Sequence, residues 1–219
     1  MGGPAVVMVL RRRGSTKDLD RPWRENDYAV VDLETTGLDL RRDTIASYGI
    51  APICGGRMLV ADQTYGLVRP ESPLSPQSIT VHALRPADLV QAPPLSQAIA
   101  AVEAALRNRV LIAHVAWVEH AFLTRAFAQH GKRFKYRIID TAALARAAGL
   151  DAARGCGEPD LETLATELRL PVVSPHHALG DAITTGYVFF ALAAQLGRRG
   201  YRTARDFIDL TEVDGCRRR

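Results

Sequence analysis

The first half of the chain alternates between short apolar runs and turns. Apolar runs over 28–33, 44–53 and 58–68 have the length and residue content of β-strands. Gly55 and Gly56 separate the second run from the third, and such a pair is typical of a hairpin. The pattern therefore predicts three antiparallel strands.

Helical periodicity replaces this pattern in the second half. Apolar residues three and four apart predict helices over 94–107, 116–130, 141–148, 161–168, 181–196 and 201–210. Short apolar runs at 110–113 and 136–139 fall between helices, as in parallel αβ units. Together the two halves predict an α/β fold with a mixed five-stranded sheet flanked by helices.

The same patterning bounds one domain. Residues 26–212 hold every predicted element without an internal repeat or linker. We expect residues 1–25 to form a flexible basic arm and residues 213–219 to form a basic C-terminal tail. The apolar run before Arg11 precedes its arginines, the reverse of a signal peptide, and no run reaches the ~18 residues that cross a bilayer. We therefore expect a cytoplasmic protein with no membrane partner.

Composition and charge change this picture only slightly. Of the 219 residues, 47% are hydrophobic and 24% charged, which is ordinary for a globular protein. The net charge is +4, and 25 of the 28 cations are Arg, which suits phosphate contacts but also follows from coding bias. Three widely spaced cysteines argue against a disulfide framework or a structural metal site.

Two carboxylates end the first predicted strand. Asp32 and Glu34 are two residues apart, so both side chains point to one face of the strand. Like charges held together raise each other's pKa unless a cation lies between them, and Mg²⁺ is commonly held by such carboxylates. A solvated strand end is the alternative. Beyond it, Gly37 is free to adopt a positive φ, and Leu38 forms an exposed apolar tip suited to a ligand.

A second candidate group lies far downstream, in the segment HHALGDA. His176 precedes Asp181 by five residues, and Asp181 opens a predicted helix that would hold it in place. Histidine titrates near neutral pH and suits a general base, and the adjacent His177 is its rival. The alternative is that Asp181 is a helix N-cap beside a surface histidine.

Three segments, VVDLETTGLD, AHVAWVEHAFL and HHALGDA, together resemble the motifs of the DEDDh 3′→5′ exonucleases, over about residues 27–197. That family includes the proofreading epsilon subunit of bacterial DNA polymerase III. The resemblance implies a ribonuclease H-like fold and two metal ions, Mg²⁺ or Mn²⁺. It implies that Asp32 bridges both ions, Glu34 binds one and places the attacking water, and Asp181 completes the metal shell. His176 would deprotonate the water.

The resemblance also implies substrate contacts. These would come from Thr35, Thr36, Gly37, Leu38 and His82. Leu38 would lie against the terminal base. His82, in SITVHALRPADL, resembles the family's His-Gly-Ile-Thr segment near the substrate strand, although Ala83 replaces the Gly.

The middle motif departs from the family pattern HNxxFDxxFL, because here it reads HVAWVEHAFL. Val115 replaces the Asn, and Glu119 stands where the Asp would be. Glu119 keeps the charge on a side chain one methylene longer, and we expect a metal ligand; the alternative is a surface glutamate in a partly degraded site. His114 is expected to be structural, and Asp140 a helix N-cap.

The resemblance implies a metal-dependent exonuclease acting on 3′ ends of single-stranded nucleic acid, with DNA favoured over RNA. Two alternatives stay open. One is an exoribonuclease or oligoribonuclease of the same fold, and the other is a nucleic-acid-binding protein with an impaired active site. A polymerase association is also open, but the short sequence after Leu210 favours a stand-alone enzyme.

Overall fold

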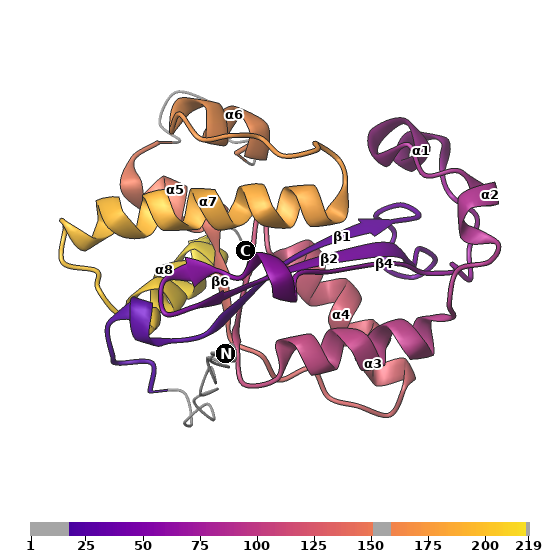
Figure 1. Ribbon diagram of the computed structural model, residues 1–219, viewed down its shortest axis with the longest axis horizontal. Helices are drawn as coiled ribbons and strands as arrows, with labels where there is room; N and C mark the ends of the chain where they lie inside the picture. The colour runs from indigo at the N-terminus through magenta and orange to yellow at the C-terminus, as the bar shows by residue number, and fades with distance from the viewer. Residues whose placement is uncertain (1–17, 151–158, 218–219) are drawn as a thin grey trace, which may run out of the picture.

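The computed structural model describes residues 18–150 and 159–217. These residues form a mixed six-stranded sheet with helices around it (Figure 1). The strands are β1 (Tyr28–Thr35), β2 (Ile45–Cys54), β3 (Arg57–Met58), β4 (Thr64–Leu67), β5 (Val110–Ala113) and β6 (Ile138–Asp140). Their order is β3-β2-β1-β5-β6, and β4 also pairs with β2. The β1–β2, β2–β3 and β2–β4 pairs are antiparallel, whereas β1–β5 and β5–β6 are parallel. The predicted mixed α/β fold is confirmed.

The sheet has six strands rather than five because the predicted strand over 58–68 is divided. A 3-10 turn at Val60–Asp62 separates β3 from β4. The partner strand explains the interruption: Pro52 accepts a hydrogen bond from Leu59 N (2.8 Å) but has no N–H to donate in return. The edge ladder of β2 therefore lacks a donor at this point, and the chain leaves the sheet.

Eight helices surround the sheet within the described residues. They are α1 (Pro76–His82), α2 (Pro86–Leu89), α3 (Leu95–Leu106), α4 (Trp117–Gln129), α5 (Thr141–Ala148), α6 (Leu161–Glu167), α7 (Ala178–Gly197) and α8 (Ala204–Arg217). Sequence patterning missed α1 and α2. A signal for α1 was present, since Ser75 Oγ accepts a hydrogen bond from Ser78 N (3.0 Å) and Pro76 follows at the first helical position.

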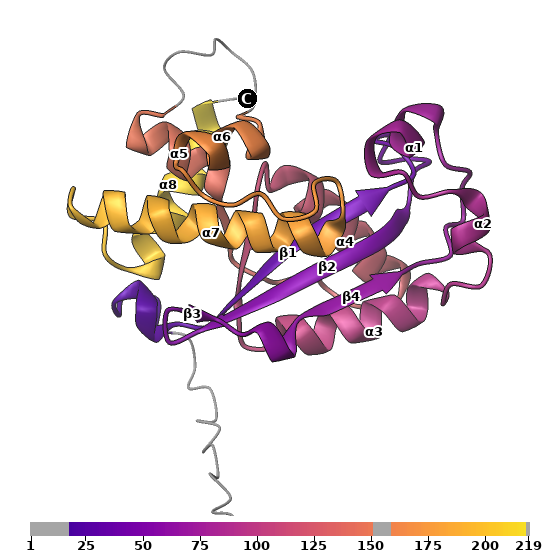
Figure 2. The same cartoon turned by 45° about the horizontal axis from the view of Figure 1, so that its top comes forward.

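The helices form one layer on each face of the sheet. Val30 and Ile112 face a core with α5, α6, α7 and α8, whereas Val31 and Leu111 face a second core with α3 and α4. Figure 2 shows α7 lying over β1 and β2. Because β1 is covered on both faces, its sequence is a continuous apolar run rather than an alternating one.

Both ends of the predicted domain extend further than the sequence indicates. Trp23 is buried, packs edge-on against Phe189 at 5.3 Å between ring centroids, and accepts a hydrogen bond from Tyr28 Oη at its carbonyl (2.7 Å). Residues 18–25 of the predicted arm therefore belong to the fold, and residues 1–17 lie outside the described part. At the other end, α8 continues to Arg217, inside the predicted tail.

Helix α7 is the long apolar helix of the core. Its 20 residues and mean hydropathy of 1.2 would also suit a membrane span by length and composition. However, Ala182, Phe189 and Leu192 are fully buried against the rest of the domain, so core packing accounts for its composition. Its first turn touches the sheet at Gly49, where a Cβ would lie 2.2 Å from Leu179 N. This close approach places the start of α7 beside the end of β1.

Candidate active site

Three carboxylates from two distant segments meet at the end of β1. Asp32 and Glu34 lie on β1, and Asp181 lies in the first turn of α7. One carboxylate oxygen from each of the three lies within 4.8 Å of the others. This is the arrangement that the resemblance implies, and oxygen ligands at such spacing suit a hard divalent cation.

Asp181 does not cap its helix, as the alternative interpretation required. The helix begins at Ala178, three residues earlier than its carboxylate, and His177 occupies the N-cap position. Asp181 N donates to His177 O (2.9 Å) as an ordinary helical amide. The Asp181 side chain is therefore available to the acidic cluster, close to the positive end of the helix dipole.

Burial and neighbouring acidic groups raise the pKa of all three carboxylates. Burial raises the pKa of Asp32 well above its usual value, and the charges of Glu119, Glu34 and Asp181 add to this. Burial, with the charge of Asp181, raises the pKa of Glu34 to about 8. Burial also raises the pKa of Asp181 to about 6, against an opposing effect from His176. A divalent cation would offset this repulsion, so the charge arrangement fits a metal site.

Glu119 is buried on α4 rather than exposed, so the surface-glutamate alternative is wrong. Its side chain is 4% exposed, and Oε2 has no hydrogen-bond partner among the described residues. Burial, followed by the charges of Asp140 and Glu34, raises its pKa to about 8. Glu119 lies outside the group of three, yet its charge is the largest acting on Asp32. An unpaired buried carboxylate oxygen is costly, so Glu119 Oε2 is suited to bind a cation or to accept a hydrogen bond.

The two adjacent histidines have different surroundings. His176 has a positive φ of 58° and an exposed side chain, with Nε2 3.3 Å from Glu162 Oε1 on α6. His177 stacks on Tyr65, with 4.3 Å between ring centroids and 27° between ring planes. His176 is thus presented on a loop at the rim of the acidic cluster, whereas His177 is held against β4.

The loop after β1 uses its polar groups internally. Thr35 Oγ1 donates to Gly37 O (2.8 Å), and Thr36 Oγ1 donates to Asp43 Oδ1 (2.9 Å). Gly37 is not among the glycines with a positive φ, so the prediction about its backbone is wrong. Space requires the glycine instead, because a Cβ would lie 2.4 Å from Asp43 Oδ2. Leu38 is 64% exposed, as its predicted role requires.

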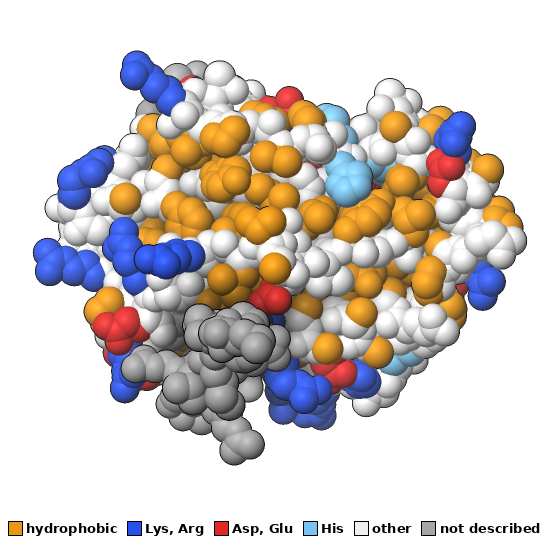
Figure 3. Space-filling model, viewed as in Figure 1, with side chains coloured by type: hydrophobic (Ala, Val, Ile, Leu, Met, Phe, Trp, Pro, Cys, Tyr) orange, Lys and Arg blue, Asp and Glu red, His pale blue; other side chains and the backbone are white. Residues whose placement is uncertain are grey.

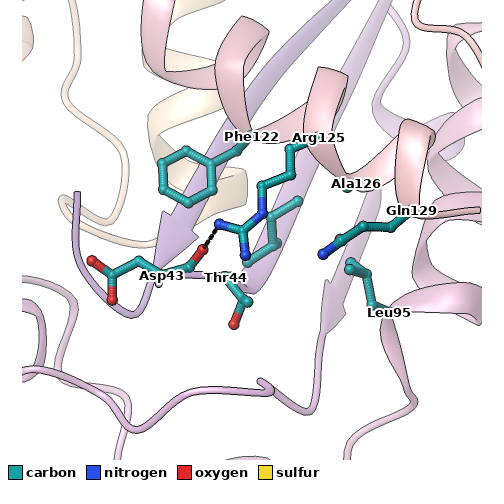
Figure 4. Close-up of a pocket in the computed structure, with 8 residues that line it drawn as sticks. Asp43, Thr44, Leu95, Phe122, Arg125, Ala126 and Gln129 are labelled. Atoms are coloured by element: carbon teal, nitrogen blue, oxygen red, sulfur yellow. Dashed lines mark hydrogen bonds between the residues drawn. The ribbon is translucent and has the colours of Figure 1, made fainter. Parts of the chain in front are cut away.

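Arg125 is a functional candidate that the sequence reasoning missed. It reaches from α4 into the loop after β1, and Nη1 donates to the carbonyls of Leu40 and Asp43, the latter at 2.9 Å (Figure 4). The pocket beside it, lined by Leu95 and Phe122 among others, is about 10 Å³, enough for one water. Arg125 therefore fixes the loop that carries Leu38. No local sequence signal links residues so far apart.

His82 is buried beneath this loop. Its Nδ1 accepts a hydrogen bond from Leu84 N (3.1 Å), which leaves Nε2–H to face Thr35 O at 3.3 Å. Burial lowers the pKa of His82 and favours its neutral form. These contacts give His82 a role in fixing α1 to the end of β1.

The prediction that Asp140 is a helix N-cap is confirmed. Asp140 caps α5 by accepting a hydrogen bond from Ala142 N (2.9 Å), and it also accepts one from Val115 N (3.0 Å). His114 lies 2.8 Å from Thr141 Oγ1 and 2.7 Å from Pro159 O. Val115 has a φ of 55°, which a β-branched residue adopts only with strain and which Asn tolerates.

Comparison with known proteins identifies the family and the fold of the chain. The sequence model of the family RNase_T, described as Exonuclease, matches residues 29–189. A DNA polymerase III subunit epsilon-like protein of Rhodobacter capsulatus is 30% identical over 196 residues, which are 89% of this chain and 28% of the relative. DNA polymerase III PolC-type of Oceanobacillus iheyensis is 29% identical over 184 residues, 82% of this chain and 12% of the relative. The chain thus spans a small part of either relative.

Two solved structures share the fold. Exonuclease X, in complex with 5′ overhanging duplex DNA, has a TM-score of 0.66 and 23% identity, covering 84% of this chain and 99% of that one. Exonuclease I of E. coli, in complex with a dT13 oligonucleotide, has a TM-score of 0.69 and 12% identity, covering 79% of this chain and 42% of that one. The ribonuclease H-like fold is thereby confirmed.

Proposed function

Because the chain belongs to the exonuclease family, we propose that it is a metal-dependent 3′→5′ exonuclease acting on single-stranded nucleic acid. The observation that carries this proposal is the acidic cluster of Asp32, Glu34 and Asp181, within 4.8 Å of one another. The buried, unpartnered oxygen of Glu119 supports it. Four carboxylates in one place have a physical reason only if they share cations.

The four carboxylates would hold Mg²⁺ or Mn²⁺. When bound, two such ions activate water and offset charge on the phosphate in an in-line displacement. Asp32, Glu34 and Asp181 would hold the ions, and Glu119 would contribute a fourth carboxylate from α4. The attacking water would form a bond to phosphorus as the bond to the preceding 3′ oxygen breaks. A nucleoside monophosphate would leave, and the strand would keep a new 3′ hydroxyl.

His176 would take the proton from the attacking water. Its exposed position on a loop before α7 lets the ring move between Glu162 and the cluster, which a general base requires. His177 is a weaker candidate, since its ring is engaged with Tyr65. Leu38, held out by the Arg125 contacts, would pack against the terminal base.

Single-stranded DNA is the favoured substrate. The two structural neighbours were solved with DNA, one of them with a single-stranded oligonucleotide. RNA remains the alternative, since discrimination depends on contacts to the 2′ hydroxyl. The reaction would take place in the cytoplasm, and the names of the two relatives make a DNA polymerase the first partner to test.

The test uses 5′-labelled single-stranded DNA and RNA of one sequence, incubated with Mg²⁺, Mn²⁺ or EDTA. We expect a metal-dependent ladder that shortens from the 3′ end and is absent for a folded Asp32→Ala variant. His176→Ala should slow cleavage by about 10²–10⁴-fold, and His177→Ala by less. A larger loss with His177→Ala would exchange their roles.

A nucleic-acid-binding protein with an impaired site is the second candidate. The position of Glu119 outside the group of three favours it, because Mg²⁺ tolerates little departure from octahedral geometry. Intact strands in both metals, together with retained binding of the labelled strand, would establish this second function and reject the nuclease.

A further inference from the structure

A row of cations lies on the segment that joins α4 to β6. Residues 132–137 read Lys-Arg-Phe-Lys-Tyr-Arg, and exposure alternates along them. Arg133, Lys135 and Arg137 are exposed, whereas Phe134 and Tyr136 are half-buried. Alternation with a period of two is that of an extended chain, so the three cations share one side at a spacing of about 6.6 Å.

Aromatic packing fixes this segment to the domain. The Phe134 ring lies 5.4 Å from that of Phe127 on α4 and 5.0 Å from that of Tyr136, between centroids. The backbone is tied at both ends, because Lys132 N donates to Phe127 O (2.9 Å) and Leu111 N donates to Arg137 O (2.9 Å). The row of cations is therefore held in place before any partner arrives, which lowers the entropy cost of binding.

Few carboxylates compensate this row. Within 18–150 and 159–217, no ion pair engages Arg133 or Lys135, and Lys132 pairs with Glu103. Arg137 Nη1 lies 3.5 Å from Glu212 Oε1, but both side chains are 63% exposed, and such pairs contribute little. Figure 3 shows several Lys and Arg side chains along the lower edge of the molecule, with an acidic side chain between them.

The row is remote from the acidic cluster. It leads into the start of β6, whereas the cluster lies near the end of β1, and the two strands run in the same direction. The length of β1 separates the two edges of the sheet by on the order of 20 Å. This distance corresponds to about six stacked nucleotides at 3.4 Å each.

We propose that Arg133, Lys135 and Arg137 form a second contact surface for the phosphate backbone of the substrate, on the 5′ side of the end being cleaved. The proposal rests on the proposed nuclease function. Regularly spaced cations on a fixed backbone match a polymer with evenly spaced charges better than an acidic protein. Contacts to phosphates carry no base preference, so the surface would lengthen the bound strand without restricting its sequence.

The test compares the triple variant R133S/K135S/R137S with the matched control R57S/R198S/R202S, which removes three exposed cations elsewhere. Binding of a labelled 25-mer and a trimer is measured in EDTA over a salt series. With the row variant, 25-mer binding should weaken about tenfold at low salt, and the slope of log K against log salt should fall by about 2. Trimer binding and the control variant should match wild type.

Cleavage in Mg²⁺ or Mn²⁺ provides an independent measurement. The row variant should raise KM for the 25-mer and leave both kcat and trimer cleavage unchanged. If both triple variants lost the same affinity for the 25-mer, the effect would come from net charge alone, and the proposal would be overturned. Unchanged 25-mer binding would also overturn it and leave an acidic protein as the class of partner. If the wild-type protein cleaved nothing, the proposed nuclease function would be rejected. The binding measurements in EDTA would still test whether the row of cations contacts the strand.

Discussion

Each of two neighbouring strand-to-helix junctions places a carboxylate beside the sheet, and the two carboxylates differ in burial and in hydrogen bonding. At the junction of β6 and α5, Asp140 accepts hydrogen bonds from Ala142 N and Val115 N. At the junction of β5 and α4, Glu119 is more deeply buried than Asp140, and its Oε2 has no hydrogen-bond partner among the described residues. Burial raises the pKa of both carboxylates, and backbone hydrogen bonds oppose this rise in each. For Asp140 the charges of His114 and Arg146 oppose it as well.

The difference separates a structural carboxylate from a functional one. The protein supplies two amide donors to Asp140 Oδ1, as a helix cap requires. Glu119 is left without a full set of donors next to three other acids, and it becomes favourable only if a cation is added. Deeper burial and a carboxylate oxygen without a partner together distinguish Glu119 from Asp140.

Metal removal should show the largest effect. Without metal, Glu34 and Glu119 have pKa values of about 8 in the folded state, above the unfolded value near 4.5. The folded state then binds more protons between these values, so its stability is present at low pH and lost as pH rises towards 8. In EDTA we expect Tm to fall by about 4–8 °C between pH 5 and pH 8, corresponding to about 2 kcal/mol. Saturating Mg²⁺ should abolish the fall, and a Tm that rises in EDTA would contradict it.

Glu119→Gln should weaken metal binding and stabilise the metal-free protein. The substitution removes a charge that raises the pKa of Asp32, so metal-free stability at pH 8 should increase and its pH dependence should weaken. Affinity for Mg²⁺, measured from the metal dependence of Tm, should fall by about 10–100-fold. Glu71→Gln, at an exposed site, is the control and should change neither quantity.

Asp140→Ala should lower stability but leave metal affinity unchanged. Loss of the cap on α5 should lower the free energy of unfolding by about 1–2 kcal/mol, measured in urea without metal. Metal affinity should stay close to that of wild type. If Asp140→Ala weakened metal binding more than Glu119→Gln, the distinction between the two junctions would be wrong.

Val115→Asn should have the smallest effect on stability. Val115 joins the two junctions through its hydrogen bond to Asp140. Val115 donates to Asp140 from a left-handed backbone conformation that disfavours β-branched residues. Asn should relieve this strain and raise the free energy of unfolding by about 1 kcal/mol. Val81→Asn, in helix α1, is the matched control and should give no gain. A loss with Val115→Asn would show that side-chain packing outweighs the backbone strain.

The sequence predicted those parts of the site that depend on local spacing. Residues two apart on a strand must share a face, which places Asp32 beside Glu34. Asp140 before a helical run is a local N-cap pattern, and Glu119 falls at a fixed position within its motif. The fold class followed from the change of period between the two halves.

Features that depend on contacts between distant backbones could not be predicted. The role of Gly37 depends on Asp43 folding back over it, and the Arg125 contacts cross from α4 to another loop. The division of β3 from β4 depends on a missing donor at Pro52, on the partner strand. Such features arise when two segments meet, so neither segment alone carries a signal.

The close approach at Gly49 has a consequence for the spacing of the acidic cluster. Since the first turn of α7 rests directly on the backbone of β2, the gap between Asp181 and the β1 carboxylates is set by main-chain dimensions. Mg²⁺ binds oxygen at about 2.0–2.1 Å, whereas Ca²⁺ requires about 2.3–2.6 Å. A single methyl group at this position would push the helix outward and widen the gap between Asp181 and the β1 carboxylates, where the proposed ions would lie. A residue without a side chain thus sets the spacing of the three carboxylates.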